Sequence, residues 1–198
     1  MNVLSDALRQ VASDLDRRKL SWALVGGFAV SARAEPRFTR DIDIAVAVGT
    51  DADAEQLVRS LMGDGYRLFA SVEQDATGRL ATVRMTRKVT ADDEVVVDLL
   101  FASSGIEPEI VAAADLLEIL PGLTLPVAKA GHLIALKILA RDDESRPQDL
   151  ADLRALHAEA TAEDLQDARE ALTTISKRGY HRDRDLLSAF EKSAPRQD

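Results

Sequence analysis

Residues 24–46, LVGGFAVSARAEPRFTRDIDIAV, contain the pattern that predicts the fold. An apolar run breaks at Gly26-Gly27, and the apolar residues that follow, 28–34, are compatible with a helix. In residues 41–48, large apolar side chains alternate with acids and small residues, which is typical of a half-buried strand. We therefore expect a strand, a glycine turn, a short helix and a second strand.

The same periodicities predict the elements on either side of this segment. Helices are expected over 4–15 and 52–62, and strands over 66–70, 80–86 and 95–101. The two prolines and the glycine of LPGLTLP, residues 120–126, indicate a loop, and four helices are expected after it, over 128–140, 147–158, 162–176 and 184–192. The predicted fold is thus an α/β core with a mixed sheet over residues 1–125, followed by a C-terminal helical bundle over 126–198.

Composition limits the classes of protein that this chain can be. A length of 198 residues, with 46% hydrophobic and 30% charged residues, fits one compact body with a sizeable core. The absence of cysteine excludes disulfides and thiolate metal sites. No apolar stretch reaches the about 18–20 residues of a membrane helix, and no signal peptide is evident, so the expected compartment is the cytoplasm.

Charge argues against indiscriminate binding to nucleic acid. The formal net charge is −9, so the molecule as a whole repels polyanions and any RNA contact requires a local basic patch. Two basic groups are candidates, each with solvated surface charge as the alternative. The first precedes the acidic strand (Arg33, Arg37, Arg40), and the second lies near the C-terminus (Lys177, Arg178, His181, Arg182, Arg184).

Asp41 and Asp43 are the first candidates for a catalytic metal site. Two residues apart on a strand, they project from the same face with Cα atoms about 7 Å apart. Carboxylate oxygens without thiolates favour Mg²⁺ or Mn²⁺, and a divalent cation would remove the repulsion between the two acids. The alternative is an ordinary polar strand face.

Two further features strengthen this hypothesis. Gly26 and Gly27 lie where a strand turns into a helix, so free N–H groups there could receive phosphate oxygens, although any tight turn can contain two glycines. Asp98 lies within the apolar run VVVDLLF, where a buried carboxylate needs a cation, an arginine or a metal as its partner. An edge-strand position open to water is the alternative for Asp98.

A second candidate group lies in the helical half. Lys137 is the one charged residue in an apolar helix, so its ammonium group needs an anion, which could be a triphosphate or the carboxylate of Asp149. Asp149 falls in the first turn of its helix, where the helix dipole favours any acid. Asp152 could replace it, although a solvated helix face is our default interpretation of Asp152.

The motifs together resemble a known family. Gly26-Gly27, Asp41-x-Asp43 and Asp98 resemble the nucleotidyltransferase fold of DNA polymerase β-like enzymes, and GGFAVSARAEPRFTRDIDIAV resembles AbiEii-type toxins, a group that includes the tRNA-modifying MenT toxins. The likeness continues through KAGHLIALKILARDDESRPQDLADL and RGYHRDRDL, so it covers about residues 20–186.

This resemblance implies a metal-dependent nucleotidyltransferase toxin that transfers NMP from an NTP to the 3′ end of tRNA. Asp41, Asp43 and Asp98 would hold Mg²⁺, with Asp98 also helping to deprotonate the acceptor. Lys137 and Asp149 would complete the catalytic set. Gly26, Gly27, Arg40 and Lys137 would bind the nucleotide, and Lys177, Arg178, Arg182 and Arg184 would bind RNA.

The resemblance also implies a cognate antitoxin that acts as a kinase on Thr39. Extended backbone would place Thr39 on the same face as Asp41 and Asp43, where a phosphate would silence the site. A threonine that caps a loop is the alternative. Two other functions remain open, namely nucleotidyl transfer to a small molecule or a protein hydroxyl, and a catalytically silent binding module.

Overall fold

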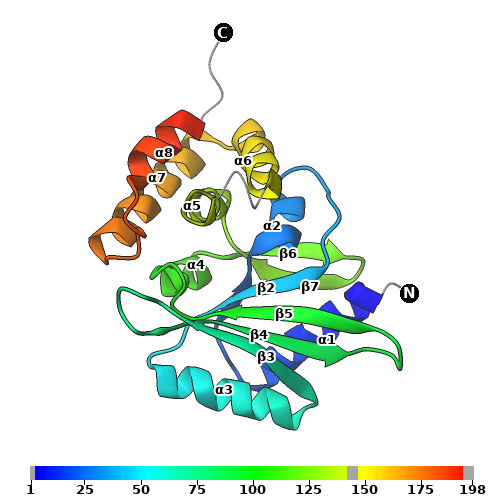
Figure 1. The fold of residues 1–198 in the computed structure, drawn as a ribbon. Helices are drawn as coiled ribbons and strands as arrows, with labels where there is room; N and C mark the ends of the chain where they lie inside the picture. Colours follow the sequence, from blue (N-terminus) through cyan, green and yellow to red (C-terminus); the bar gives the residue numbers. More distant parts are fainter. Residues whose placement is uncertain (1–2, 142–146, 194–198) are drawn as a thin grey trace.

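The computed structural model describes residues 3–141 and 147–193. Its centre is a seven-stranded mixed sheet in the order β3-β4-β5-β2-β1-β7-β6 (Figure 1). The strands are β1 (Trp22–Leu24), β2 (Asp41–Val46), β3 (Tyr66–Glu73), β4 (Leu80–Lys88), β5 (Glu94–Leu100), β6 (Asp115–Leu120) and β7 (Leu123–Val127). The prediction of an α/β core with a mixed sheet is confirmed.

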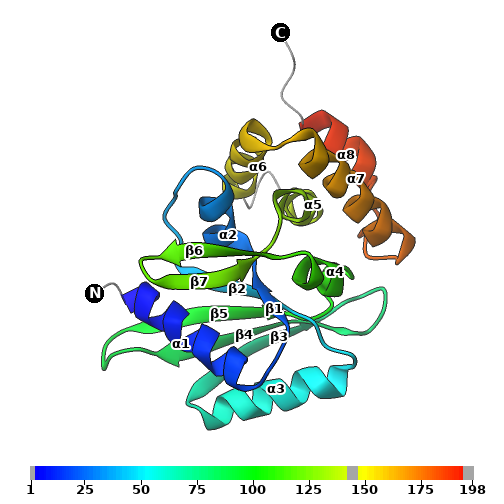
Figure 2. The ribbon, with the colours of Figure 1, turned by 180° about the vertical axis from the view of Figure 1, so that it is seen from behind.

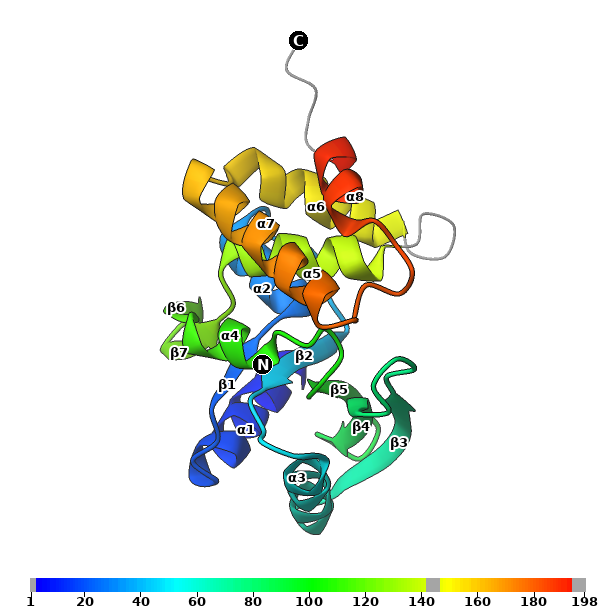
Figure 3. The same ribbon diagram turned by 90° about the vertical axis from the view of Figure 1, so that its left-hand side faces the viewer.

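Helices cover both faces of the sheet. They are α1 (Val3–Arg17), α2 (Gly26–Arg33), α3 (Asp51–Gly63), α4 (Glu107–Ala112), α5 (Ala130–Ala140), α6 (Pro147–Glu159), α7 (Ala162–Lys177) and α8 (Leu186–Ser193). Figure 2 shows α1 and α3 on one side of the sheet, and Figure 3 shows α2, α4 and the four C-terminal helices on the other. No described helix is both long and apolar enough to cross a lipid bilayer.

The apolar spacing of the sequence explains this packing. Leu8, Val11 and Leu15 of α1 are buried, as their helical spacing predicts. In β2, Ile42 and Ile44 are fully buried while the two acids between and before them are only half-buried. Alternation along β2 therefore fills the core on one face and presents carboxylates on the other.

Two expectations need correction. The LPGLTLP segment is a hairpin rather than a loop: Pro121-Gly122 forms its turn, and β7 lies between β1 and β6 despite Pro126. The short helix α4 was not expected either. The division of the chain at residue 125 stays a prediction.

Helix α5 connects the C-terminal helices to the sheet. It contacts α6, α7 and α8 on one side and α2 on the other. Because α2 begins directly after β1, this packing brings the glycine turn, the acidic strand β2 and the C-terminal helices to one place (Figure 3).

Candidate active site

The three candidate metal ligands come from neighbouring strands. Strands β2 and β5 are parallel, and Asp43 is the register partner of Asp98. Although Asp43 is only half-buried by its exposed surface, the protein packed around its carboxyl group desolvates it, and this desolvation, with the negative charges of Asp98 and Asp41, raises the pKa of Asp43 to about 6. A carboxyl group in this environment gains strongly from a cation.

The glycine turn lies directly against this carboxylate. Gly26 has a φ of +60°, and a Cβ atom on it would be 1.9 Å from Oδ2 of Asp43. A backbone hydrogen bond from Gly27 lowers the pKa of Asp43 and so offsets part of the rise. The first turn of α2 is therefore directed at the acidic strand, and only glycine fits at position 26.

Asp98 has a protein partner in this structure. Nε and Nη2 of Arg84 donate to its two carboxylate oxygens at 2.8 and 2.6 Å, and this pairing raises the pKa of Arg84. Arg84 lies opposite Asp98 in the β4–β5 ladder. The sequence analysis did not identify Arg84, because its alternation with buried Val83 and Met85 shows only that it points away from the core, whereas its meeting with Asp98 depends on the strand register.

The donor set suits a hard divalent cation, although it is not closed around one. Carboxylates of Asp41 and Asp43 meet at the α2 turn, and their mutual repulsion is the kind that Mg²⁺ or Mn²⁺ removes. Within residues 3–141 and 147–193, no three acidic or histidine side chains already enclose a metal position. For Asp98 to become a ligand, it must exchange Arg84 for the metal.

Lys137 lies in a buried ionic network. Its Nζ donates to Oδ1 of Asp149 at 2.6 Å and is 2.7 Å from Oδ2 of Asp152. The ion pair with Asp149, which the sequence left as an alternative to triphosphate binding, is thus present. Lys137 also lines the cavities described below, so the pair holds its ammonium group at the candidate site.

The solvated interpretation of Asp152 is wrong. Asp152 is 1% exposed, and it accepts hydrogen bonds from Nη2 of Arg37 at 2.9 Å and Nε2 of Gln148 at 3.1 Å. Burial alone would raise its pKa, but the hydrogen bonds from Lys137, Gln148 and Arg37 outweigh burial and hold the pKa below its usual range. Asp152 therefore links α6 to α5 and to the loop before β2.

That loop, residues 34–40, runs beside the glycine turn. The Thr39 hydroxyl donates to the backbone oxygen of Asp41 at 3.2 Å, and it lies so close to Gly27 that a Cβ there would be 2.5 Å away. The Arg40 guanidinium lies 5.7 Å from the centre of the exposed Phe38 ring. Thr39 and Arg40 both line the smaller of the two cavities at the candidate site.

The remaining basic candidates have different surroundings. Arg33 pairs with Asp115 at 2.7 Å, and Arg178 pairs with Glu109 at 2.6 Å. Nη1 of Arg184 donates to the carbonyl oxygens of Leu139 and Arg141, both at 3.1 Å, at the end of α5. These three arginines have structural contacts, and Arg182 lines the larger cavity.

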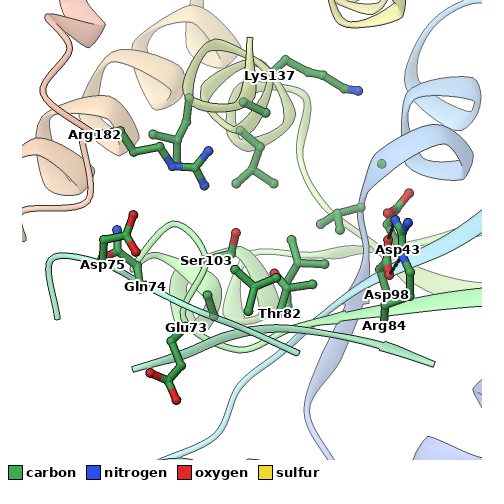
Figure 4. Close-up of a pocket in the computed structure, with 18 of the residues that line it drawn as sticks. Asp43, Glu73, Gln74, Asp75, Thr82, Arg84, Asp98, Ser103, Lys137 and Arg182 are labelled. Atoms are coloured by element: carbon green, nitrogen blue, oxygen red, sulfur yellow. Dashed lines mark hydrogen bonds and ion pairs between the residues drawn. The ribbon is translucent and has the colours of Figure 1, made fainter. Parts of the chain in front are cut away.

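Two cavities meet at Asp43. The larger, of about 970 Å³, runs between the β3–β5 face and α5; the smaller, of about 340 Å³, lies under the loop before β2. Gly26, Asp43 and Lys137 line both. Figure 4 shows Asp43, Asp98 and Arg84 at one end of the larger cavity, and Gln74, Asp75 and Arg182 at the other.

The cavities differ in charge. Carboxylates outnumber permanent cations in the larger one, with six acids (Asp43, Glu73, Asp75, Asp98, Asp149, Asp183) against three bases (Arg84, Lys137, Arg182). In the smaller one, three bases (Arg37, Arg40, Lys137) outnumber two acids (Asp41, Asp43). Lys137 and Arg37 are paired with Asp149 and Asp152 behind this lining, so the smaller cavity is the less acidic of the two. Because the N-terminus of α2 also opens into it, it is the better site for a polyanion.

Comparisons with known proteins support this architecture. The crystal structure of an antigenic nucleotidyltransferase-like protein from Paracoccidioides brasiliensis is similar, with a TM-score of 0.51 and 20% identity over 91% of this chain and 88% of that chain. The solution structure of the antibiotic-resistance factor ANT(2″)-Ia has a TM-score of 0.50 and 19% identity over 97% of this chain and 94% of that chain. Both share the fold.

A search of curated proteins found no match. Among protein families, the one described as nucleotidyl transferase AbiEii toxin, type IV toxin–antitoxin system, matches residues 8–198. The chain therefore belongs to the AbiEii family of nucleotidyltransferase toxins.

Proposed function

We propose that this nucleotidyltransferase transfers NMP from an NTP to the 3′-terminal hydroxyl of tRNA. The observation that carries this proposal is the meeting of Asp41, Asp43 and Asp98 on adjacent strands at the junction of two cavities, of which the smaller is the less acidic and receives the N-terminus of α2. A transferase with two substrates needs separate sites that converge on the reacting atoms.

The smaller cavity would hold the triphosphate. Its lining includes the Gly26-Gly27 turn at the start of α2, and Arg40 and Lys137 supply positive charge. Binding there would place the α-phosphate near Asp43, where the cavity opens into the larger one.

Asp41 and Asp43, joined by Asp98 after release of Arg84, would hold Mg²⁺ or Mn²⁺. When bound, such ions neutralise phosphate charge and lower the pKa of a coordinated hydroxyl. The specific ion is part of the proposal, whereas the need of nucleotidyltransferases for an NTP and a divalent metal follows from the family.

The acceptor would enter through the larger cavity, which contains Asp98. The oxygen of its hydroxyl forms a bond to the α-phosphorus, the bond from the α-phosphorus to the bridging oxygen breaks, and pyrophosphate leaves. The hydroxyl proton passes to the Asp98 carboxylate. Lys137, held by Asp149 and Asp152, would stabilise the charge that develops on the phosphates.

RNA as the acceptor fits the far end of this cavity. Arg182 lies there, opposite Asp43 and Asp98 (Figure 4), and the exposed Lys177 belongs to the same basic segment. Arg178 and Arg184 belong to the same basic segment, but their guanidinium groups already bind Glu109 and the carbonyl oxygens at the end of α5, so Lys177 and Arg182 would be the main contacts to RNA. A nucleotide added to the 3′ end of tRNA would block aminoacylation and therefore translation, which would explain why a protein of this toxin family inhibits growth.

Regulation by phosphorylation of Thr39 belongs to the same proposal. Membership of a type IV toxin–antitoxin family implies an antitoxin, and we propose that this antitoxin is a kinase. The Thr39 hydroxyl lies over Gly27 in the smaller cavity, so a phosphate there would occupy the triphosphate position and repel the NTP. Mass mapping after co-expression with the neighbouring antitoxin, together with the activity of Thr39→Glu, tests this step.

A cationic small molecule is the second candidate acceptor. The six acids against three bases in the larger cavity favour it over an anionic strand. Label from each NTP should be followed into total RNA, total protein and an aminoglycoside, and tRNA 3′ ends should be sequenced. Label in RNA alone supports the tRNA proposal, and label in the aminoglycoside alone overturns it.

A silent binding module is tested by titration. We expect Mg²⁺ and NTP each to raise the thermal unfolding midpoint of the wild-type protein, because each binds the folded state. An unchanged midpoint in both titrations, together with no labelled product, would contradict catalysis.

A further inference from the structure

Two phenylalanines are almost fully exposed at the candidate site. The exposed fraction is 78% for Phe38 and 71% for Phe69. Folded proteins usually bury phenylalanine, so two exposed rings beside a cleft require an explanation. Phe38 lines the smaller cavity and Phe69 the larger one, so each cavity has one exposed ring.

Phe38 lies next to the phosphate-binding surface. It directly precedes Thr39, whose hydroxyl lies over Gly27, and its ring is 5.7 Å from the guanidinium of Arg40. A nucleotide with its triphosphate at Gly27 would have its base within reach of this ring. Arg40 can then contact a phosphate while the ring stacks on the base.

Phe69 lies on the edge strand β3, at an irregularity in its pairing with β4. The register shifts between Leu68 and Ala70, so Phe69 has no partner in the ladder. Such bulges redirect a side chain and are common next to active sites. Here the bulge places Phe69 on the wall of the cavity that also contains Asp98.

We propose that the two rings are separate stacking platforms, Phe38 for the base of the incoming NTP and Phe69 for the terminal base of the RNA acceptor. The Phe69 half of this proposal rests on the proposed tRNA function. Aromatic stacking accepts any base, because every base has a flat π-face. Phe38 would therefore position the NTP on one side of Asp43 and Asp98, and Phe69 would position the RNA acceptor on the other.

The test is a pair of reciprocal kinetic measurements. Phe38→Ala and Phe69→Ala are assayed for KM and kcat with NTP varied at saturating tRNA, and with tRNA varied at saturating NTP. We expect Phe38→Ala to raise the KM for NTP, and Phe69→Ala the KM for tRNA, each between about 5- and 150-fold. The KM for the other substrate should stay within about twofold in each variant.

The controls separate stacking from folding and from general hydrophobicity. Leu116 is 72% exposed on β6, at the opposite edge of the sheet, so Leu116→Ala should leave both KM values unchanged. Phe38→Trp and Phe69→Trp should retain the wild-type KM, whereas Phe→Leu at either position should behave like alanine. Thermal unfolding midpoints should be unchanged throughout, because the rings are exposed.

The outcomes are distinct. The reciprocal pattern with rescue by tryptophan supports the inference. If wild-type protein labels tRNA but both alanine variants keep both KM values, or each variant changes both, the inference is wrong while the tRNA function stands. If wild-type protein labels no RNA, the tRNA function fails, and the role of Phe69 fails with it.

Discussion

At position 26 the candidate site has room for glycine but not for a residue with a Cβ atom. A Cβ would be 1.9 Å from Oδ2 of Asp43, and the φ of +60° disfavours any other residue. We predict that Gly26→Ala displaces Asp43 and lowers transfer by about 100-fold or more, the size of effect seen when one preorganised electrostatic group is lost. Initial rates at saturating NTP measure it.

Gly122 supplies the matched control. It also has a positive φ, +70°, but a Cβ there meets nothing within 4 Å. Gly122→Ala should lose stability, from backbone strain, and keep full activity. Equal losses of activity in the two variants would mean that strain alone explains the effect at Gly26.

Asp43 should make the metal-free protein less stable near neutral pH. Its pKa is about 6 in the folded state against an ordinary 3.8, so between these values the folded state holds a proton that the unfolded state has released. Stability therefore falls as pH rises from about 4 to 6. We predict that Asp43→Asn raises the free energy of unfolding at pH 7.5 by on the order of 3 kcal/mol, and hardly at all at pH 4.

Chemical denaturation in EDTA at both pH values measures this difference. Asp92→Asn, at an exposed site, is the control for removing one negative charge. Mg²⁺ should stabilise the wild type and not Asp43→Asn. A stability difference that is the same at pH 4 and pH 7.5 would contradict the assignment.

Within the helices, Lys137 forms structural ion pairs and also lines both cavities of the candidate site. Asp149 and Asp152 hold its ammonium group at the junction of the cavities. We predict that Lys137→Met lowers kcat by about 100-fold or more with a smaller effect on the KM for NTP. A Met variant that is fully active would show that the network is only structural.

Arg184, which the sequence assigns to RNA binding, instead stabilises the end of helix α5 in the structure. Its guanidinium donates to the carbonyls of Leu139 and Arg141 at the end of α5, where backbone oxygens lack helical partners. We predict that Arg184→Gln lowers the free energy of unfolding by about 1.5–3 kcal/mol, measured in urea. Lys177→Gln, at an exposed position, should have no such effect.

The elements also show what sequence could predict. The period-2 pattern of β2 predicted both the strand and the shared face of Asp41 and Asp43, because side-chain direction follows from alternation. The apolar runs of β4 and β5 predicted two further strands. The β6–β7 hairpin was missed since Pro126 and Gly122 are also typical of loops. Arg84 and the burial of Asp152 depend on strand register and helix docking, which no local pattern encodes.

For the whole molecule, charge decides how an RNA acceptor reaches the site. With a net charge of −9, long-range attraction cannot guide RNA, so local cations must hold it. We predict that Lys177→Glu and Arg182→Glu each raise the KM for tRNA and reduce its dependence on salt by about one unit of log–log slope, with the KM for NTP unchanged. KM values measured between low and physiological salt test both parts.

Arg59→Glu is the control that distinguishes direct contact with tRNA from the effect of the protein's net charge. Arg59 lies on α3, on the far side of the sheet from the C-terminal helices (Figure 1), and pairs with Glu55 at 3.1 Å. Replacing it with glutamate changes the net charge by the same amount as the other two substitutions. It should leave the salt slope for tRNA unchanged. If all three reversals act alike, only the overall charge matters. If Arg182→Glu instead lowers the KM for an aminoglycoside and tRNA remains unlabelled, the acidic cavity serves a cationic acceptor, because added negative charge then attracts the substrate.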